Sequence, residues 1–293
     1  MGCRSENPEI QGNGLRKVRV RLAGVTFSVS CRYGSNADFF RDYACGGEPL
    51  FEVAASREDM ERVREALERQ SAEEAADPCR ASAVEAMDLS RVSASEAADL
   101  RCALAAEAAD PGRVSGAFLE NAAIHALAAD RLIDYGALVM HGSALAFDGR
   151  AFIFTAPSGT GKSTHAALWR ERFGSRVTMI NDDKPILRFT ENEIFACGSP
   201  WMGGHGLGSN IEAPLCAIAL IERSSENRIE ELGADEAVRV LYGQAVESKD
   251  PARMKKIMEM LARLIKEIPL YRLQCNAEPE AAAVACEAMA PLE

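Results

Sequence analysis

The residues of this sequence best suited to chemistry lie between Ala156 and Ser163, which read Ala-Pro-Ser-Gly-Thr-Gly-Lys-Ser. Glycines in such a stretch let successive backbone N–H groups turn toward a phosphate, because no Cβ atom obstructs the turn. The lysine that follows can reach the outer phosphates, and the next hydroxyl can ligate Mg²⁺. The pattern therefore predicts a phosphate-binding loop for a nucleoside triphosphate or a similar polyphosphate.

The segments that flank this loop are the ones that the motif requires. The apolar run 151–155 predicts a strand, and residues 164–169 have helical spacing. A helix that begins at the loop adds the partial positive charge of its N-terminus. Ala156 in place of the usual first glycine is a mild departure. The residues expected to contact the nucleotide are Pro157, Ser158, Gly159, Thr160, Gly161, Lys162, Ser163 and Thr164.

Two adjacent carboxylates form the second group of candidate residues. Asp182 and Asp183 follow the apolar run 177–181, which we expect to be a strand beside the strand of the phosphate loop. One carboxylate can hold the Mg²⁺ that bridges the phosphates, and the other can accept a proton from an attacking hydroxyl. The pair favours transfer to an alcohol over hydrolysis by water. The alternative is that one of the two only caps a turn.

A histidine and several arginines are weaker candidates. His141 ends an apolar run and precedes a glycine, so it is either a buried core histidine or part of the site. Phosphoryl transfer also calls for a positive charge on the phosphates. Arg188, Arg223 and Arg228 are the candidates for that charge, although each also fits an ordinary surface position.

The elements that position these residues divide the chain into three parts. Residues 1–14 are polar and predict a loose leader, and 15–114 predict a small α+β region with an alanine-rich acidic segment at 71–110. Residues 115–293 mix strands with helices and predict an α/β nucleotide-binding domain. Within the second part, the expected elements are a hairpin of 18–22 with 25–30, a strand at 50–53 and a helix capped by Ser56 with Asp59. Those of the third part are a helix ending near 134, strands at 137–142, 143–147, 185–189, 193–196, 216–222 and 270–273, and helices near 235–246, 251–267 and 278–289.

Composition narrows the class of function. The chain of 293 residues is 47% apolar and 26% charged, with a net charge of −11 and no basic stripe, which argues against nucleic-acid binding. No run approaches the ~20 apolar residues that span a membrane. The nine cysteines form no Cys-x-x-Cys pair, so we expect reduced cysteines in a cytoplasmic protein.

Three motifs in this order resemble the catalytic domain of HPr kinase/phosphorylase. The resemblance covers roughly residues 130–290, and it is closer to the wider group of HPr-serine-kinase-like proteins, whose fold is related to that of phosphoenolpyruvate carboxykinase. The residues that carry it are His141-Gly142-Ser143-Ala144-Leu145-Ala146, Gly149, Pro157-Ser158-Gly159-Thr160-Gly161-Lys162-Ser163 and Asn181-Asp182-Asp183.

The resemblance implies a kinase that uses ATP and Mg²⁺ to phosphorylate a serine or another hydroxyl of a protein, peptide or small molecule. By motif position, Asp182 would be the general base, His141 would tune it, and Lys162 would act on the phosphates. Ser163 and Asp183 would be the metal ligands. A homo-oligomer is also implied, since hexamers occur in the resembled family.

Other features leave the acceptor and any phosphorylase activity open. Thr164 stands where the bifunctional enzymes tend to carry glutamate, and the glycine-rich segment 198–210 does not match the signature that they place after the aspartates. That segment, with Trp201, His205 and Asn210, is either a lid or a solvated loop. A nucleotide-responsive binding module and a P-loop ATPase or GTPase remain as alternatives.

Overall fold

The computed structural model describes residues 9–10, 14–76, 114–157, 159–203, 206–245 and 248–290. The chain divides into two compact units, Met1–Tyr135 and Gly136–Glu293. Most of the predicted leader and of the alanine-rich segment lies outside the described residues, as do Ser158 and His205.

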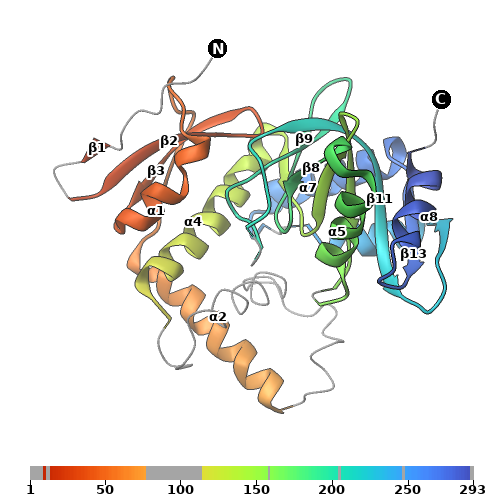
Figure 1. The fold of residues 1–293 in the computed structure, drawn as a ribbon. Coiled ribbons are helices and arrows are strands. Elements are labelled where there is room, and N and C mark those ends of the chain that lie inside the picture. The colour runs from red at the N-terminus through yellow and green to blue at the C-terminus, as the bar shows by residue number, and fades with distance from the viewer. Residues whose placement is uncertain are drawn as a thin grey trace. The chain divides into compact units, whose positions relative to one another are not determined.

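The N-terminal unit is a small sheet with helices (Figure 1). Its strands, in the order β1-β2-β3-β4, are β1 (Glu9–Ile10), β2 (Arg16–Leu22), β3 (Val25–Cys31) and β4 (Glu52–Ala54). Its helices are α1 (Gly34–Phe39), α2 (Arg57–Ala76) and α4 (Gly116–Leu132), with short 3₁₀ turns at Arg41–Tyr43 and Ile133–Tyr135. The predicted hairpin is confirmed, because β2 and β3 pair antiparallel from Arg16 opposite Cys31 to Leu22 opposite Val25.

The capping box predicted at the start of α2 is also confirmed. The Asp59 backbone N–H donates to Ser56 Oγ at 3.1 Å, and the Ser56 backbone N–H donates to Asp59 Oδ2 at 2.9 Å. These two bonds satisfy N–H groups that a helix start otherwise leaves without partners. Helix α4, which the sequence-based division grouped with the C-terminal part, packs against α2 and belongs to the N-terminal unit.

The C-terminal unit contains a mixed sheet with four helices in its described residues. Its strands are β5 (Ala137–Val139), β6 (Ser143–Phe147), β7 (Arg150–Thr155), β8 (Val177–Asn181), β9 (Ile186–Phe189), β10 (Ile194–Cys197), β11 (Glu212–Arg223), β12 (Arg228–Glu231) and β13 (Leu270–Cys275). Its helices are α5 (Lys162–Phe173), α6 (Ala234–Tyr242), α7 (Pro251–Glu267) and α8 (Glu280–Met289), with a 3₁₀ turn at Gly174–Arg176. The prediction of an α/β fold is confirmed for this unit.

Strand order corrects one expectation. The sheet runs β5-β9-β10-β11-β7-β6-β8. Strand β13 pairs with the edge of β11 that faces away from β7. Strand β6 therefore lies between the phosphate-loop strand β7 and the strand β8 that leads to the aspartates, which we had expected to be neighbours. The β6–β8 ladder is irregular between Ala144 and Leu145, where its register shifts.

Strand direction brings the candidate residues to one edge of the sheet. Strands β7, β11 and β13 are parallel, and β6 is antiparallel to both β7 and β8. The carboxyl ends of β7, β8, β11 and β13 therefore lie at the same edge as the start of β6. Crevices at the carboxyl ends of parallel strands are where α/β sheets bind ligands.

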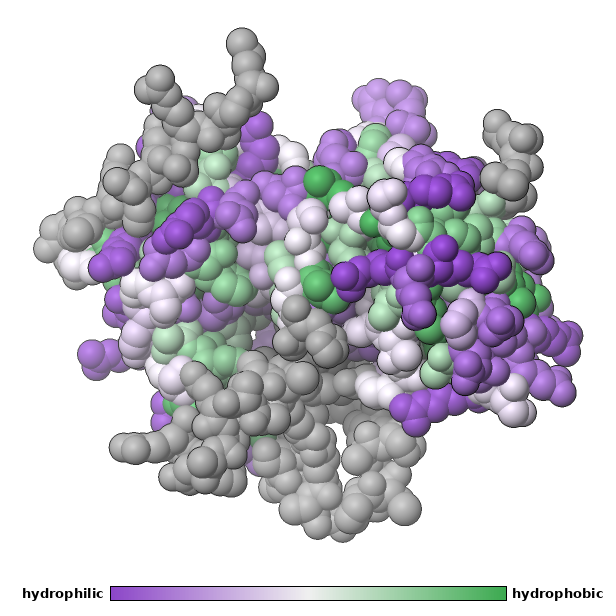
Figure 2. Space-filling view, viewed as in Figure 1, coloured by the Kyte–Doolittle hydropathy of each residue, from purple (hydrophilic) through white to green (hydrophobic). Residues whose placement is uncertain are grey.

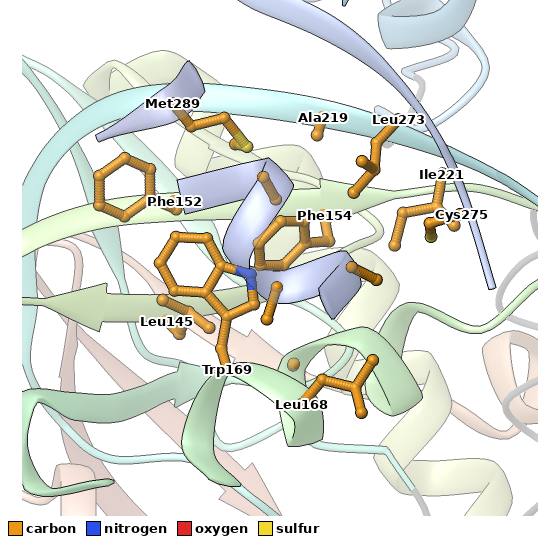
Figure 3. Packing of buried hydrophobic residues seen from close by; sticks show 14 of the residues in the cluster. Leu145, Phe152, Phe154, Leu168, Trp169, Ala219, Ile221, Leu273, Cys275 and Met289 are labelled. Carbon is orange, nitrogen blue, oxygen red and sulfur yellow. The ribbon is translucent and has the colours of Figure 1, made fainter. Parts of the chain in front are cut away.

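The core beneath this edge is aromatic (Figure 3). Trp169 of α5 is fully buried, and its ring centroid lies 5.7 Å from that of Phe152 and 5.7 Å from that of Phe154. Helix α8 packs against α5 and contributes Met289 to the same cluster. The phosphate loop thus begins and ends on rigidly packed elements.

Hydrophilic residues cover much of the face shown in Figure 2, with apolar residues scattered between them. Within the described ranges, no helix combines the length and the apolar composition that crossing a bilayer demands. The six cysteines that the structure describes, Cys31, Cys45, Cys197, Cys216, Cys275 and Cys286, are all free thiols.

Candidate functional site

The phosphate loop connects the end of β7 to the start of α5. Gly159 has a φ of 75° and Gly161 a φ of 126°, and both values favour glycine over residues with a side chain. Helix α5 begins at Lys162, so its first N–H groups face the loop. The loop therefore has the backbone that anion binding at a helix N-terminus requires.

Lys162 lies against this loop. Its Nζ donates to the Ala156 carbonyl at 3.0 Å and lies 3.5 Å from the Pro157 carbonyl, and the residue is only 8% exposed. Ser163 is half-buried and Thr164 is exposed on the first turn of α5. The predicted contact Ser158 lies outside the described residues.

Of the three candidate arginines, Arg223 contacts the loop. Its guanidinium donates to the carbonyl of Thr160 at 3.1 Å and to the carbonyl of Gly159. Arg188 instead forms an ion pair with Glu212, and Arg228 pairs with Glu230. A positive charge at the end of β11 thus lies beside the glycines of the loop.

His141 lies next to Asp183, whereas the motif resemblance implied that it tunes Asp182. The distance from His141 Nε2 to Asp183 Oδ1 is 3.4 Å, and Lys184 Nζ lies 3.7 Å from the same oxygen. The other ring nitrogen, Nδ1, lies 3.1 Å from Gln244 Oε1. All three of His141, Asp183 and Lys184 are buried.

The surroundings of His141 favour the neutral form of its imidazole. Burial lowers the pKa of His141 well below its usual value, and the positive charges of Lys184 and Lys162 lower it further. A neutral ring can orient a carboxylate and accept or donate a proton without adding a fixed charge to the site.

Asp182 has a different set of partners. Its Oδ1 accepts from the Gly203 backbone N–H at 2.8 Å, and its Oδ2 lies 3.4 Å from the Leu207 backbone N. The carboxylate therefore holds the described part of the glycine-rich segment 198–210. Asp183 thus contacts the histidine, and Asp182 contacts the glycine-rich segment.

Asn181 fixes the turn that separates these two carboxylates. Its Oδ1 accepts from the backbone N–H groups of Asp183 at 2.8 Å and Lys184 at 2.6 Å. Its Nδ2 donates to Ser199 and to the Trp201 carbonyl at 3.1 Å. Every polar group of this buried amide is used, so the turn is held in one conformation.

Three hydrogen bonds connect the end of β7, residues 141–143 and the turn that carries Asp182 and Asp183, which we call the acidic turn. Thr155, at the end of β7, donates its hydroxyl to the His141 carbonyl at 3.0 Å. The Gly142 backbone N–H donates to the Asp183 carbonyl at 2.9 Å. Ser143 Oγ donates to the Asp182 carbonyl at 3.2 Å. The structure thereby brings His141 and Asp183 together beside the strand that carries the phosphate loop.

Lys184 and Gln244 belong to this group, although the sequence pattern did not single them out. Lys184 follows the two aspartates directly, so its place next to an acidic pair is the one signal that the sequence carries for it. Gln244 is 103 residues from His141 and carries no local signal. The His141 backbone N–H also donates to the Gln244 carbonyl, which anchors this contact.

The donor set fits Mg²⁺ held together with a nucleotide. Mg²⁺ takes one or two carboxylates, with water and phosphate oxygens as its other ligands. Ser163, Asp182 and Asp183 offer a hydroxyl and two carboxylates of this kind. Across the part of the chain that the structure describes, no cluster of three or more His, Cys, Asp or Glu side chains could form a cage for a metal by itself.

Comparisons with known proteins matched one family model and a number of solved structures. The model of a family described as "SynChlorMet cassette protein ScmC" matches residues 121–280. A solved structure of the Hpr(Ser) kinase/phosphatase from Coxiella burnetii is similar at 11% identity and a TM-score of 0.29. That match covers 50% of this chain and 93% of the other. The search of curated proteins found no match.

Proposed function

The chain belongs to the ScmC family of SynChlorMet cassette proteins, and from that premise we propose that it is a kinase of the HPr-serine-kinase type. It transfers the γ-phosphoryl group of ATP to a serine or another hydroxyl of a protein, peptide or small molecule. The observation that carries the proposal is the group formed by Lys162 at the phosphate loop and the buried pair of His141 with Asp183. A binding module that only senses nucleotide has no need of such a pair.

We assign the proton acceptor to Asp183, because its carboxylate is the one that lies 3.4 Å from the imidazole of His141. In the reaction the acceptor oxygen forms a bond to the γ-phosphorus, the bond from that phosphorus to the β,γ-bridging oxygen breaks, and ADP leaves. The hydroxyl proton passes to Asp183, which His141 keeps in position.

The remaining residues bind and orient the phosphates. Lys162 offers a positive charge at the loop, and Arg223 offers a second one beside Gly159 and Thr160. We assign the metal to Ser163 and Asp182, because hydroxyl and carboxylate oxygens are ligands that suit Mg²⁺. Mg²⁺, when bound, supplies charge neutralisation on the phosphates.

The test compares transfer with binding in three variants. Purified protein is incubated with γ-labelled ATP and a host lysate, and ATP affinity is measured by calorimetry. Asp183→Asn should lower transfer about 10²–10⁴-fold, because general-base catalysis contributes that much, while ATP affinity stays nearly constant. Lys162→Ala should lose both transfer and binding. Glu226→Gln, which neutralises an exposed carboxylate of the same unit, should change neither.

Each other result points elsewhere. Full transfer by Asp183→Asn would show that the proton acceptor is misassigned. Tight ATP binding by the wild type without a labelled product would favour the binding module. Steady phosphate release that needs no acceptor would favour an NTPase.

A further inference from the structure

A second feature of the C-terminal unit is a cavity beside the phosphate loop. It has a volume of about 240 Å³ and opens to solvent. Thr160 and Gly161 of the loop and Thr164 on the first turn of α5 line one side of it. Ligand pockets usually measure about 300–1,000 Å³. The cavity is therefore large enough for a part of a ligand whose remainder lies outside it.

The cavity and the acidic turn lie on opposite sides of the loop strand. In the sheet, β11 and then β13 follow β7 on one side, while β6 and then β8 follow it on the other. The cavity is lined by Ile221 and Arg223 of β11 and by residues at and after the end of β13. His141 and Asp183 lie on the β6–β8 side. A ligand in the cavity that also contacts the loop would therefore extend toward the acidic turn.

The lining is chemically mixed. Leu168, Ile221 and Ala277 present apolar surface, and Arg223 and Asn276 present polar groups. Such apolar walls are unsuited to a phosphate group, which requires hydrogen-bond donors on all sides. They suit a flat ring whose faces are apolar and whose edges are polar, and a guanidinium can stack on such a ring.

The floor of the cavity is fixed before any ligand binds. Trp169 Nε1 donates to His165 Nε2 at 3.1 Å, and His165 Nδ1 lies 3.9 Å from Cys275 Sγ. Leu168, Ile221 and Cys275 also belong to the core cluster shown in Figure 3. The polar rim is equally tied down, since Asn276 Nδ2 donates to the Ser225 carbonyl at 3.3 Å.

We propose that this cavity binds the nucleoside part of the nucleoside triphosphate. The base and sugar then lie at the ends of β11 and β13, and the phosphates run across the loop so that the terminal one faces Asp183. This inference rests on the proposed kinase function. It adds the direction in which the nucleotide lies and the residues that distinguish a nucleotide from an inorganic polyphosphate.

The experiment compares two ligands that share their phosphates. The affinities of Mg·ATP and of Mg·tripolyphosphate are measured by calorimetry on the full chain. The wild type should bind ATP more tightly than tripolyphosphate. Ala277→Trp, at an exposed position on the cavity wall, should weaken ATP binding by about tenfold or more and leave tripolyphosphate binding nearly unchanged. Ala262→Trp, on the exposed face of α7, is the matched control and should alter neither affinity.

Binding of tripolyphosphate also reports that a variant is folded. Equal affinities of the wild type for the two ligands, or unchanged ATP binding by Ala277→Trp, would overturn the nucleoside site and leave the phosphate loop intact. If Ala277→Trp bound both ligands equally less tightly than the wild type, that result would also overturn the nucleoside site. Absence of binding of either ligand to the wild type would instead refute the proposed function, and the nucleoside site with it.

Discussion

At the scale of single residues, His165 shows how the phosphate-loop helix is held to the core. Burial lowers the pKa of His165 to about 4, so the ring is neutral at neutral pH. Trp169 can only donate, so the Nε2 atom that faces it must be the unprotonated nitrogen. The ring proton is therefore on Nδ1, toward Cys275. Protonation of Nε2 would break the bond to Trp169.

We predict that this histidine makes the C-terminal unit sensitive to acid. Its folded pKa of about 4 lies below the ordinary value of 6.5, so between these pH values the unfolded chain binds the proton first. The stabilisation is complete above about pH 6.5 and is lost as the pH falls toward 4, by an amount on the order of 3 kcal/mol. Urea unfolding of the wild type and of His165→Gln at a series of pH values measures it.

His141 is also buried with a lowered pKa, so it too makes the free energy of unfolding fall in acid. The His165→Gln variant keeps this contribution of His141 and therefore serves as the reference. Below pH 6.5, the wild type should lose stability more steeply than His165→Gln. Parallel pH profiles for the two proteins would show that His165 does not carry the effect.

At the scale of elements, the hairpin of β6 and β7 supplies both sides of the candidate site. Ser143 starts β6 at the acidic turn, and Thr155 ends β7 at the phosphate loop. The strands are joined by Asp148 and Gly149, with φ values of 50° and 79°. Two central residues with positive φ form the turn whose twist matches that of a hairpin. An Asp-Gly pair suits this turn, because both residues adopt positive φ more readily than most others.

We predict that Gly149→Ala lowers the free energy of unfolding by about 1–2 kcal/mol, because a Cβ atom is disfavoured by that amount in the left-handed region. Nothing lies within 4 Å of a Cβ added at Gly149, so the cost comes from the backbone alone. Gly46 is equally open but has no positive φ, so Gly46→Ala should be neutral or slightly stabilising. Denaturant midpoints of the two variants make the comparison, and equal midpoints would contradict it.

Elements with a strong local pattern could be predicted from the sequence. The helix from Pro251 to Glu267 has an apolar stripe, an Asp250 cap and a proline at its first position, and the structure reproduces it. The strands expected at 185–189 and 193–196 are likewise present as β9 and β10, which pair antiparallel. Strand β12, Arg228–Glu231, is mostly polar and was not expected.

Relations between distant elements could not be read in this way. Hydrophobic period gives the direction of a side chain within one strand but not the order of strands in a sheet, so the insertion of β6 between β7 and β8 was missed. For the same reason, the pattern could not tell which of Asp182 and Asp183 faces His141. The contact depends on the turn that Asn181 holds and on Gln244 from a remote helix end.

At the scale of the whole molecule, the chain consists of two units, and the described residues of the candidate site all belong to the second. That unit has its own aromatic core around Trp169. A unit with its own core and few dependences on the rest of the chain can in principle fold alone.

We predict that a fragment of residues 136–293 unfolds cooperatively on heating and binds Mg·ATP with the affinity of the full chain. Thermal unfolding followed by circular dichroism and calorimetry with ATP measure the two properties. The same fragment with Lys162→Ala should fold but bind poorly, which separates loss of structure from loss of the site. A fragment that folds without binding, while the full chain binds, would show that the N-terminal unit contributes to the nucleotide site.

The register shift between Ala144 and Leu145 has a consequence for how such a protein can change over evolution. Irregularities of this kind bend a strand and redirect the side chains beyond them. This irregularity lies in β6, which separates the strand of the phosphate loop from the strand that leads to Asp183, the proposed proton acceptor. Remodelling it would alter the reach between donor and acceptor while every signature motif stayed intact. Two homologues with identical motifs could therefore phosphorylate alcohols of different size. The structural difference between them would then lie in the pairing of their strands.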